Sequence, residues 1–257
     1  MQALLFPMGL SAKMVLSVVV GVFLASFADG IAGGGGIISV PAYFLAGLPA
    51  HLALGTNKLS ACLGTTVSTA RYIRNGYVDW RLAAPSVLLA LSGSYFGTRL
   101  QLAVGEQFLK WLLLIVLPIV AVVVLKQRSF PEERGEIEPG RQMAIVMLAS
   151  LVIGTYDGFY GPGAGTFLLL ALTGWALLDV RNAAGLTKAA NLTSNVAALI
   201  TFILSSNVDY QLGLAGAVCN FIGAYIGSGM VLTKANKIVK PLIIVVLALL
   251  FIKIITK

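Results

Sequence analysis

The stretch Asp29-Gly30-Ile31-Ala32-Gly33-Gly34-Gly35-Gly36 lies within an otherwise apolar part of the chain, and a related stretch follows about half a chain later. The second copy reads Asp157-Gly158-Phe159-Tyr160-Gly161-Pro162-Gly163-Ala164-Gly165. In hydrocarbon, an ionised carboxylate and a backbone without regular hydrogen bonds both cost free energy. Paired interruptions at matching positions of two hydrophobic halves are typical of the binding site of a transporter.

The composition indicates a membrane protein. Of the 257 residues, 58% are hydrophobic and only 11% are charged, and the mean hydropathy is +0.92. A soluble domain has roughly 45–50% apolar and about 25% charged residues. Apolar runs recur along the chain, and many approach the roughly 20 residues that a helix needs to cross a bilayer. The sequence therefore predicts an all-α polytopic membrane protein in the inner membrane of a cell.

The match between the two halves extends well past the glycines. A shift of 128 positions superimposes the two Asp-Gly stretches, and a shift of 130 then superimposes Lys58 on Lys188. The shift of 130 also aligns Gly93-Ser94-Tyr95-Phe96-Gly97 with Gly223-Ala224-Tyr225-Ile226-Gly227. Order, spacing and residue type agree, which indicates an internal duplication.

We expect an N-terminal transmembrane repeat at 1–126, a cytoplasmic linker at 127–141 and a C-terminal transmembrane repeat at 142–257. Each repeat would contain a Gly-interrupted helix pair and then three transmembrane helices. In the first repeat the pair lies near 14–30 and 35–48, and the three helices lie near 52–74, 81–100 and 108–126. A pair that returns to its starting side makes the second repeat inverted relative to the first. A pair that forms one broken helix makes the repeats parallel.

The distribution of Lys and Arg favours the inverted arrangement, because cytoplasmic loops of membrane proteins are rich in these residues. Inversion places 11 of them on the cytoplasmic side and 5 outside, whereas the parallel arrangement gives 10 and 6, with Lys58 and Lys188 set aside as intramembrane. Both chain termini are then expected outside. The apolar run before Asp29 resembles a signal peptide, but the equivalent run before Asp157 is internal, so we expect both to belong to the fold.

The glycine clusters offer a backbone site for an anion. Gly33, Gly34, Gly35 and Gly36, like Gly161, Gly163, Ala164 and Gly165, leave main-chain N–H groups open to a ligand. A helix that starts after each cluster, from about Ile37 and from Thr166, adds the partial positive charge of its N-terminus. The alternative is that the glycines only permit close helix packing or a sharp turn.

The next apolar segment of each half begins with polar residues. Lys58 and Lys188 occupy matching positions, and a lysine at membrane depth usually faces a cavity or a partner. Hydrogen-bonding side chains close to them in sequence are Asn57, Thr187, Asn191 and Asn195. Asp29 and Asp157 could balance the charge of the lysines or take up a proton. The alternative is an ion pair that only braces the fold, between Lys58 and Asp29 or between Lys188 and Asp157.

The sequence lacks the motifs that several other functions require. The net charge of +8 comes without a basic patch interleaved with aromatic residues, so we expect no nucleic-acid partner. The sequence has no phosphate-binding GxxxxGK[ST] loop, no HExxH helix, no cluster of metal ligands and no convincing Ser/His/Asp set. We therefore expect no enzyme activity, no cofactor and no metal. The two cysteines, Cys62 and Cys219, are expected to be small core residues.

The paired motifs resemble those of the TauE/SafE sulfite exporter family, also called the toluene-sulfonate uptake permeases. The first-half resemblance rests on the stretch from Asp29 to Gly36, on Pro41 and on Thr56-Asn57-Lys58. The second-half resemblance rests on the stretch from Asp157 to Gly165 and on Lys188-Ala189-Ala190-Asn191-Leu192-Thr193-Ser194-Asn195. The resemblance covers nearly the whole chain. It implies a polytopic inner-membrane carrier for small sulfur-containing anions such as sulfite, sulfonates, sulfoacetate or thiosulfate.

Residues and resemblance together predict a secondary transporter for a small anion that works by alternating access, with the lipid bilayer as its surroundings. Proton coupling through Asp29 or Asp157 is part of this hypothesis. An anion channel is one alternative. A membrane-embedded assembly or enzyme component with a structural polar core is another.

Overall fold

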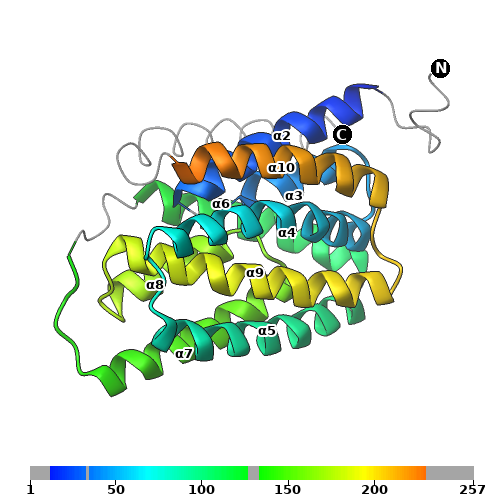
Figure 1. Cartoon of the computed structure of the whole chain (residues 1–257). Helices are drawn as coiled ribbons and strands as arrows, with labels where there is room; N and C mark the ends of the chain where they lie inside the picture. The colour runs from blue at the N-terminus through cyan, green and yellow to red at the C-terminus, as the bar shows by residue number, and fades with distance from the viewer. Residues whose placement is uncertain (1–11, 33–34, 127–132, 230–257) are drawn as a thin grey trace.

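The computed structural model describes residues 12–32, 35–126 and 133–229 (Figure 1). Within these ranges the chain forms nine helices and no strand. The helices are α2 (Ala12–Ala32), α3 (Gly36–Leu45), α4 (Ala50–Arg74), α5 (Trp80–Ala103), α6 (Glu106–Lys126), α7 (Pro139–Phe159), α8 (Ala164–Gly174), α9 (Val180–Leu204) and α10 (Tyr210–Gly229). Gly33, Gly34 and residues 230–257 of the predicted C-terminal repeat lie outside the described residues. The all-helical prediction is confirmed for the described part of the chain.

The predicted Gly-interrupted pairs are each a long helix followed by a short one. In the first half, α2 has 21 residues and α3 has 10, and in the second half α7 has 21 and α8 has 11. At about 1.5 Å per residue, α3 and α8 extend only about 15–17 Å, roughly half of the hydrocarbon thickness. Neither short helix can therefore cross a bilayer by itself.

Each long helix of the pair packs against the other half of the chain. Along the bundle, α2 packs on α10, α10 on α4, α4 on α9, α9 on α5, and α5 on α7. Figure 1 shows α2 and α10 on one side, α4 and α9 in the middle, and α5 and α7 on the other side. Exchanging each helix for its equivalent in the other half leaves this series unchanged. The two halves are therefore intertwined and share one central interface between α4 and α9.

Matching glycines allow these crossings to be close. A β-carbon at Gly97 on α5 would lie 2.0 Å from the carbonyl oxygen of Thr155 on α7, and one at Gly227 on α10 would lie 2.2 Å from that of Phe27 on α2. A real β-carbon does not approach a backbone atom so closely, so only glycine fits at both places. Small residues that let helix backbones approach are typical of packing in membranes.

The central helices α4 and α9 run in opposite directions. A β-carbon at Gly185, near the start of α9, would lie 2.0 Å from the carbonyl oxygen of Tyr77, just past the end of α4. At the other end, a β-carbon at Gly55 would meet the carbonyl oxygen of Asn207 at the same distance. The guanidinium of Arg181 stacks over the ring of Tyr77 with 5.8 Å between its central carbon and the ring centroid. The start of α9 thus lies at the end of the bundle where α4 finishes.

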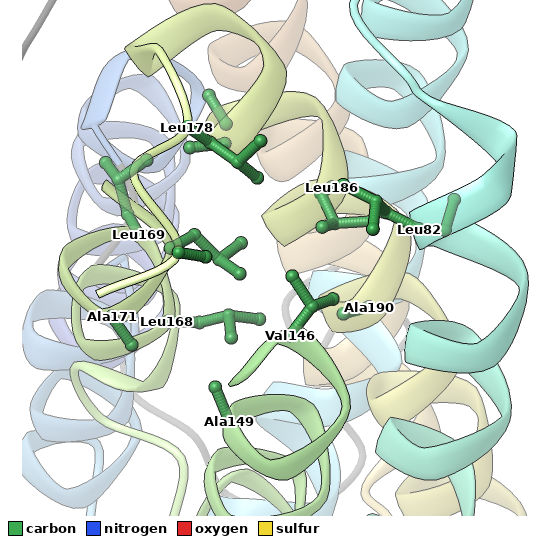
Figure 2. Close-up of a cluster of buried hydrophobic side chains, with 14 of the residues drawn as sticks. Leu82, Val146, Ala149, Leu168, Leu169, Ala171, Leu178, Leu186 and Ala190 are labelled. Carbon is green, nitrogen blue, oxygen red and sulfur yellow. The ribbon is translucent and has the colours of Figure 1, made fainter. Parts of the chain in front are cut away.

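Apolar side chains fill the bundle and also cover its outside. One buried cluster joins Leu82 of α5, Val146 of α7, Leu168 of α8 and Leu186 of α9 (Figure 2). Large apolar side chains that are more than half exposed include Leu88, Phe96, Leu148 and Val218. Extended apolar surface of this kind suits contact with lipid. By length and hydropathy, α7 and α10 can each cross a membrane.

Candidate functional site

Two buried ion pairs join the halves crosswise. The Nζ atom of Lys58 lies 2.9 Å from Oδ1 of Asp157, and the Nζ atom of Lys188 lies 2.5 Å from Oδ2 of Asp29. The alternative drawn from the sequence, an ion pair within each half, is therefore wrong about the partners. The reason is the intertwined packing, since α2 and α7 contact the opposite half and present their carboxylates to its lysine. A buried charge without a partner costs several kcal/mol, so the crossed pairs also tie the halves together.

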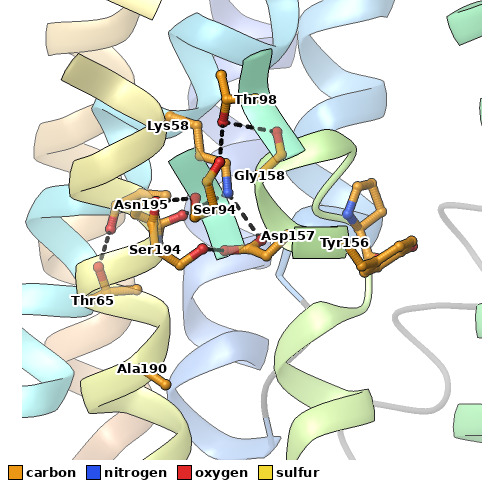
Figure 3. A network of polar contacts seen from close by, with 12 residues as sticks. Lys58, Thr65, Ser94, Thr98, Tyr156, Asp157, Gly158, Ala190, Ser194 and Asn195 are labelled. Carbon is orange, nitrogen blue, oxygen red and sulfur yellow. Dashed lines mark hydrogen bonds and ion pairs between the residues drawn. The ribbon is translucent and has the colours of Figure 1, made fainter. Parts of the chain in front are cut away.

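The carboxylate of Asp157 is held on several sides (Figure 3). The Ser194 hydroxyl donates a hydrogen bond to its Oδ2, while Lys58 pairs with Oδ1 and also donates to Oδ1 of Asn195 at 2.9 Å. Ser94 of α5 donates to the carbonyl oxygen of Ser194 at 2.7 Å. The side chain of Asp157 is 9% exposed, so its carboxylate is largely buried within this polar network.

The carboxylate of Asp29 has a more open surrounding. Its Oδ1 accepts a hydrogen bond of 3.2 Å from the backbone N–H of Gly35, and Lys188 donates to Oδ2 and to the main-chain oxygen. Thr69 of α4 donates to the carbonyl oxygen of Lys188, which attaches α9 to α4 beside this pair. The side chain of Asp29 is 21% exposed, more than twice the value for Asp157.

A small polar cavity lies beside these pairs. Its volume is about 60 Å³. It is lined by residues from both halves: Ala25, Ser26, Asp29, Gly35, Gly36, Ser39, Asn57, Lys58, Ala61, Thr65, Asp157, Gly161, Gly163, Gly165, Asn191, Asn195 and Asn220. About 12–15 Å³ is needed for each water-sized group, so this cavity has room for about four or five of them. The polar interruptions of the two halves thus meet around one hollow.

The starts of both short helices border the cavity. Gly35 and Gly36 lie at the start of α3, and Gly163 and Gly165 at the start of α8. Gly163 has φ +83°, a left-handed conformation that favours glycine. The first N–H groups of a helix have no partner inside it, and they give its N-terminus a partial positive charge. Both helix starts are therefore placed to attract a negatively charged group.

The glycines also serve close packing, which was the alternative interpretation. A β-carbon at Gly35 would lie 2.8 Å from the carbonyl oxygen of Ala25, and one at Gly163 would lie 2.4 Å from a methyl carbon of Val120. Packing and backbone exposure are thus combined at the same positions.

Most of the predicted site residues within the described part of the chain line this cavity. They are Asp29, Gly35, Gly36, Asn57, Lys58, Asp157, Gly161, Gly163, Gly165, Asn191 and Asn195. Three are not among the lining residues: Lys188, which pairs with Asp29, and the buried Ala164 and Thr187. Gly33 and Gly34 lie outside the described residues.

Four polar lining residues were not predicted, namely Ser26, Ser39, Thr65 and Asn220. Ser26 belongs to the part of α2 that resembles a signal peptide, and Thr65 lies one to two turns beyond the polar start of α4. Asn220 interrupts an apolar helix, and an intramembrane polar residue of this kind is itself a signal of function. It has no counterpart in the first half, where Ala90 stands at the equivalent position.

The site lacks the groups that would suggest metal chemistry. In the described ranges, no three His, Cys, Asp or Glu side chains come together as a metal site. The cavity instead combines two ion pairs, amide and hydroxyl side chains, and two helix starts. Asn57 Oδ1 is buried and has no hydrogen-bond partner in the described part of the chain. These groups can bind a small polar solute by charge and hydrogen bonding.

Comparison with known proteins identifies the family. The sequence profile described as "Sulfite exporter TauE/SafE" matches residues 18–254. The "Probable membrane transporter protein ORF9" of Sinorhizobium sp is 35% identical over 230 residues, which cover 88% of this chain and 87% of that protein. The "Probable membrane transporter protein YfcA" of Escherichia coli K12 is 34% identical over 88% of this chain and 84% of its own. No solved structure matches. With a family profile that spans almost all of its length and relatives of this identity, the chain belongs to the TauE/SafE sulfite exporter family and is a membrane transporter.

Proposed function

We propose that the protein is a multi-pass secondary transporter of the inner membrane that carries a small sulfur-containing anion by alternating access. The observation that carries this proposal is the cavity shared by both halves, where Lys58 and two helix starts face one hollow of about 60 Å³. Its size favours a compact oxyanion of four or five non-hydrogen atoms, such as sulfite or thiosulfate, over a long-chain sulfonate. The name of the family profile points to the same chemical class.

The charges at the site suggest how transport is coupled. Lys58 and Lys188 are each paired with a carboxylate, so the charges of the two lysines are balanced within the site. An anion that enters must therefore compete with Asp29 or Asp157 for a lysine, and a proton taken up by that carboxylate removes the competition. Charged groups in membranes often carry protons in this way. We infer that proton uptake by Asp29 or Asp157 couples transport to the proton gradient.

The packing is compatible with an inverted repeat, an architecture from which many alternating-access transporters are built. The short helices α3 and α8 cannot cross the bilayer alone, and α4 and α9 run in opposite directions. Three arginines lie at one end of the bundle: Arg71 near the end of α4, Arg181 at the start of α9 and Arg134 within the linker. Arg71 donates a hydrogen bond to the carbonyl oxygen of Tyr225 near the end of α10, and Arg181 stacks on Tyr77. Gly135, next to Arg134, bonds Leu177 just before α9. The positive-inside rule assigns that end to the cytoplasm. The linker, residues 127–141, would lie there as well.

Flux measurements test the proposal. Purified protein in proteoliposomes should exchange radiolabelled sulfite for internal sulfite, with a rate that saturates as sulfite concentration rises. Lys58→Gln should abolish this exchange, since it removes the cation that faces the cavity. Lys110→Gln is the matched control, because Lys110 is about half exposed and pairs only with Glu106 on the same helix.

Three results would contradict the proposal. Sulfite exchange at the normal rate by the Lys58→Gln variant would show that Lys58 does not bind the anion. Single-channel currents without counterflow would identify a channel instead of a carrier. Net uptake of sulfite that leaves the internal pH unchanged would contradict the proton coupling.

A further inference from the structure

The two halves differ at the cavity in a way that their sequence similarity conceals. Around Asp29 the cavity is open, whereas the equivalent space around Asp157 is filled. This second space is lined by Ala90, Ser150, Ile153, Gly154, Asp157, Leu168, Ala190, Asn191 and Ser194, and it has no room for a water-sized group. By the shifts that align the halves, Ala90 corresponds to Asn220 and Gly154 corresponds to Ser26. The polar residues of the first space are thus replaced by small, mostly apolar ones in the second.

The two halves also differ at a third pair of equivalent residues, which lies beside Asn220 in one half and beside Asp157 in the other. Ser194 in the second half corresponds to Gly64 in the first. The Ser194 hydroxyl binds the Asp157 carboxylate, whereas Gly64 has no side chain to offer Asp29. A β-carbon at Gly64 would lie 1.9 Å from Oδ1 of Asn220, so Gly64 makes the space in which the Asn220 side chain lies. In the second half, the Ser194 hydroxyl helps to close the space beside Asp157. In the first half, the Asn220 carboxamide borders the open cavity beside Asp29.

The side chain of Asn220 is mostly buried, and its carboxamide borders the cavity without a hydrogen-bond partner among the described residues. It is 7% exposed and lines the cavity, and no described residue forms a hydrogen bond with it. A buried amide without a partner costs about 1–3 kcal/mol. Such a cost is recovered when a ligand supplies the missing hydrogen bond, as happens in binding sites that select for a polar group. Asn57 borders the same cavity with a buried carbonyl oxygen that also lacks a partner.

We propose that Asn220 is a specificity-determining residue, whose carboxamide donates a hydrogen bond to the transported solute in the cavity on the Asp29 side. The equivalent space on the Asp157 side does not bind solute, because Ser194 and the packing of Ala90 against Gly154 close it. The two halves thus have unequal roles: the space beside Asp29 and Asn220 binds the solute, and the equivalent space beside Asp157 and Ala90 does not. This inference rests on the proposed transport function, since it names the side of the site that selects the solute.

Thiol labelling compares the two equivalent positions without needing the substrate. In a background with the two free cysteines replaced, Cys62→Ala and Cys219→Ala, we compare Asn220→Cys with Ala90→Cys. The reagent is a small methanethiosulfonate that carries a sulfonate group, and intact-protein mass measures the extent of reaction over time. The Asn220→Cys variant should react at least about tenfold faster than Ala90→Cys. Equal rates, or no reaction at position 220, would overturn the inference.

Sulfite exchange gives the second arm of the experiment. Asn220→Ala should weaken the apparent affinity for sulfite by about tenfold or more, and Asn220→Asp, which keeps the shape but adds a negative charge, should abolish exchange. Asn75→Ala, at an exposed position at the end of α4, should behave like the unmodified protein. Normal exchange by both Asn220 variants would contradict the inference while leaving the transport function intact. If the unmodified protein does not exchange sulfite, the proposed substrate is wrong, and the labelling contrast alone decides the role of Asn220.

Discussion

The ion pair between Lys58 and Asp157 can be separated experimentally into a structural and a functional part. Its atoms lie 2.9 Å apart, and the two side chains are 5% and 9% exposed. At an effective dielectric constant of about 20, two unit charges at that distance attract by about 6 kcal/mol. Removing the charges from water offsets much of this attraction, so the expected net loss when one partner is removed is about 3–5 kcal/mol.

A double-mutant cycle isolates the structural part. Lys58→Met and Asp157→Asn should each lower the free energy of unfolding by about 3–5 kcal/mol, because each leaves a buried charge unpaired. The double variant should recover most of that loss, since neither charge remains. Denaturant titration in detergent, followed by tryptophan fluorescence, measures all four proteins. The exposed pair of Lys110 and Glu106, 3.9 Å apart, is the control and should show a coupling of no more than about 0.5 kcal/mol.

Transport by the same proteins measures the functional part. The double variant should be folded and yet fail to exchange sulfite, because the cavity has lost its cation. If its stability loss equals the sum of the two single losses, the pair does not stabilise the fold. If it exchanges sulfite at the normal rate, Lys58 does not handle the anion, and the reasoning from the cavity is refuted.

Other predictions concern the helix crossings and the sealed side of the site. Gly97→Ala should destabilise the protein by at least about 1–3 kcal/mol through its clash with Thr155, whereas Gly105→Ala, with nothing within 4 Å, should leave the apparent melting temperature unchanged. A melting temperature that is equal for both variants would contradict the close crossing. Ser194→Ala should cost about 1–3 kcal/mol by removing the hydroxyl that bonds Asp157, and a variant as stable as the unmodified protein would show that this bond is dispensable.

The sequence predicted the helices well because their signals are local. The expected helices near 52–74, 81–100 and 108–126 correspond to α4, α5 and α6. The predicted and observed helix ends differ by no more than three residues. The start of α5 follows from Asp79, whose side chain accepts a hydrogen bond from the backbone of Arg81. Such a cap is visible in a single stretch of sequence. The repeat was equally visible, since it depends on matching residues at a constant spacing.

The partners of the ion pairs could not be predicted in the same way. Asp29 and Lys58 are 29 positions apart in one half, and nothing local indicates that α2 packs on α10 of the other half. Such an exchange depends on tertiary packing, which periodicity and spacing do not describe. The family resemblance did not decide it either, because it rests on motifs and not on contacts.

Asn220 was not predicted from the sequence as a site residue, because Asn220 has no matching residue in the other half. The comparison of the halves emphasised residues that match, and Asn220 faces Ala90 in that alignment. The open side of the cavity is distinguished by residues that differ between the halves, including Ser26 and Gly64. Residues that match between the two halves therefore locate the shared site. Residues that differ between the halves indicate on which side of the site the solute binds.

Ligand-induced stabilisation tests the central claim most directly. The claim is that the cavity between the halves binds a small anion. Purified protein is melted with sulfite, sulfate, thiosulfate, sulfoacetate, taurine and longer aliphatic sulfonates, and a ligand at 100 times its Kd stabilises by about 2.7 kcal/mol. We predict that at least one compact sulfur oxyanion raises the melting temperature, and that it no longer does so in the variant with both Lys58→Met and Asp157→Asn. No stabilisation by any of the anions, or equal stabilisation of the double variant, would contradict the claim.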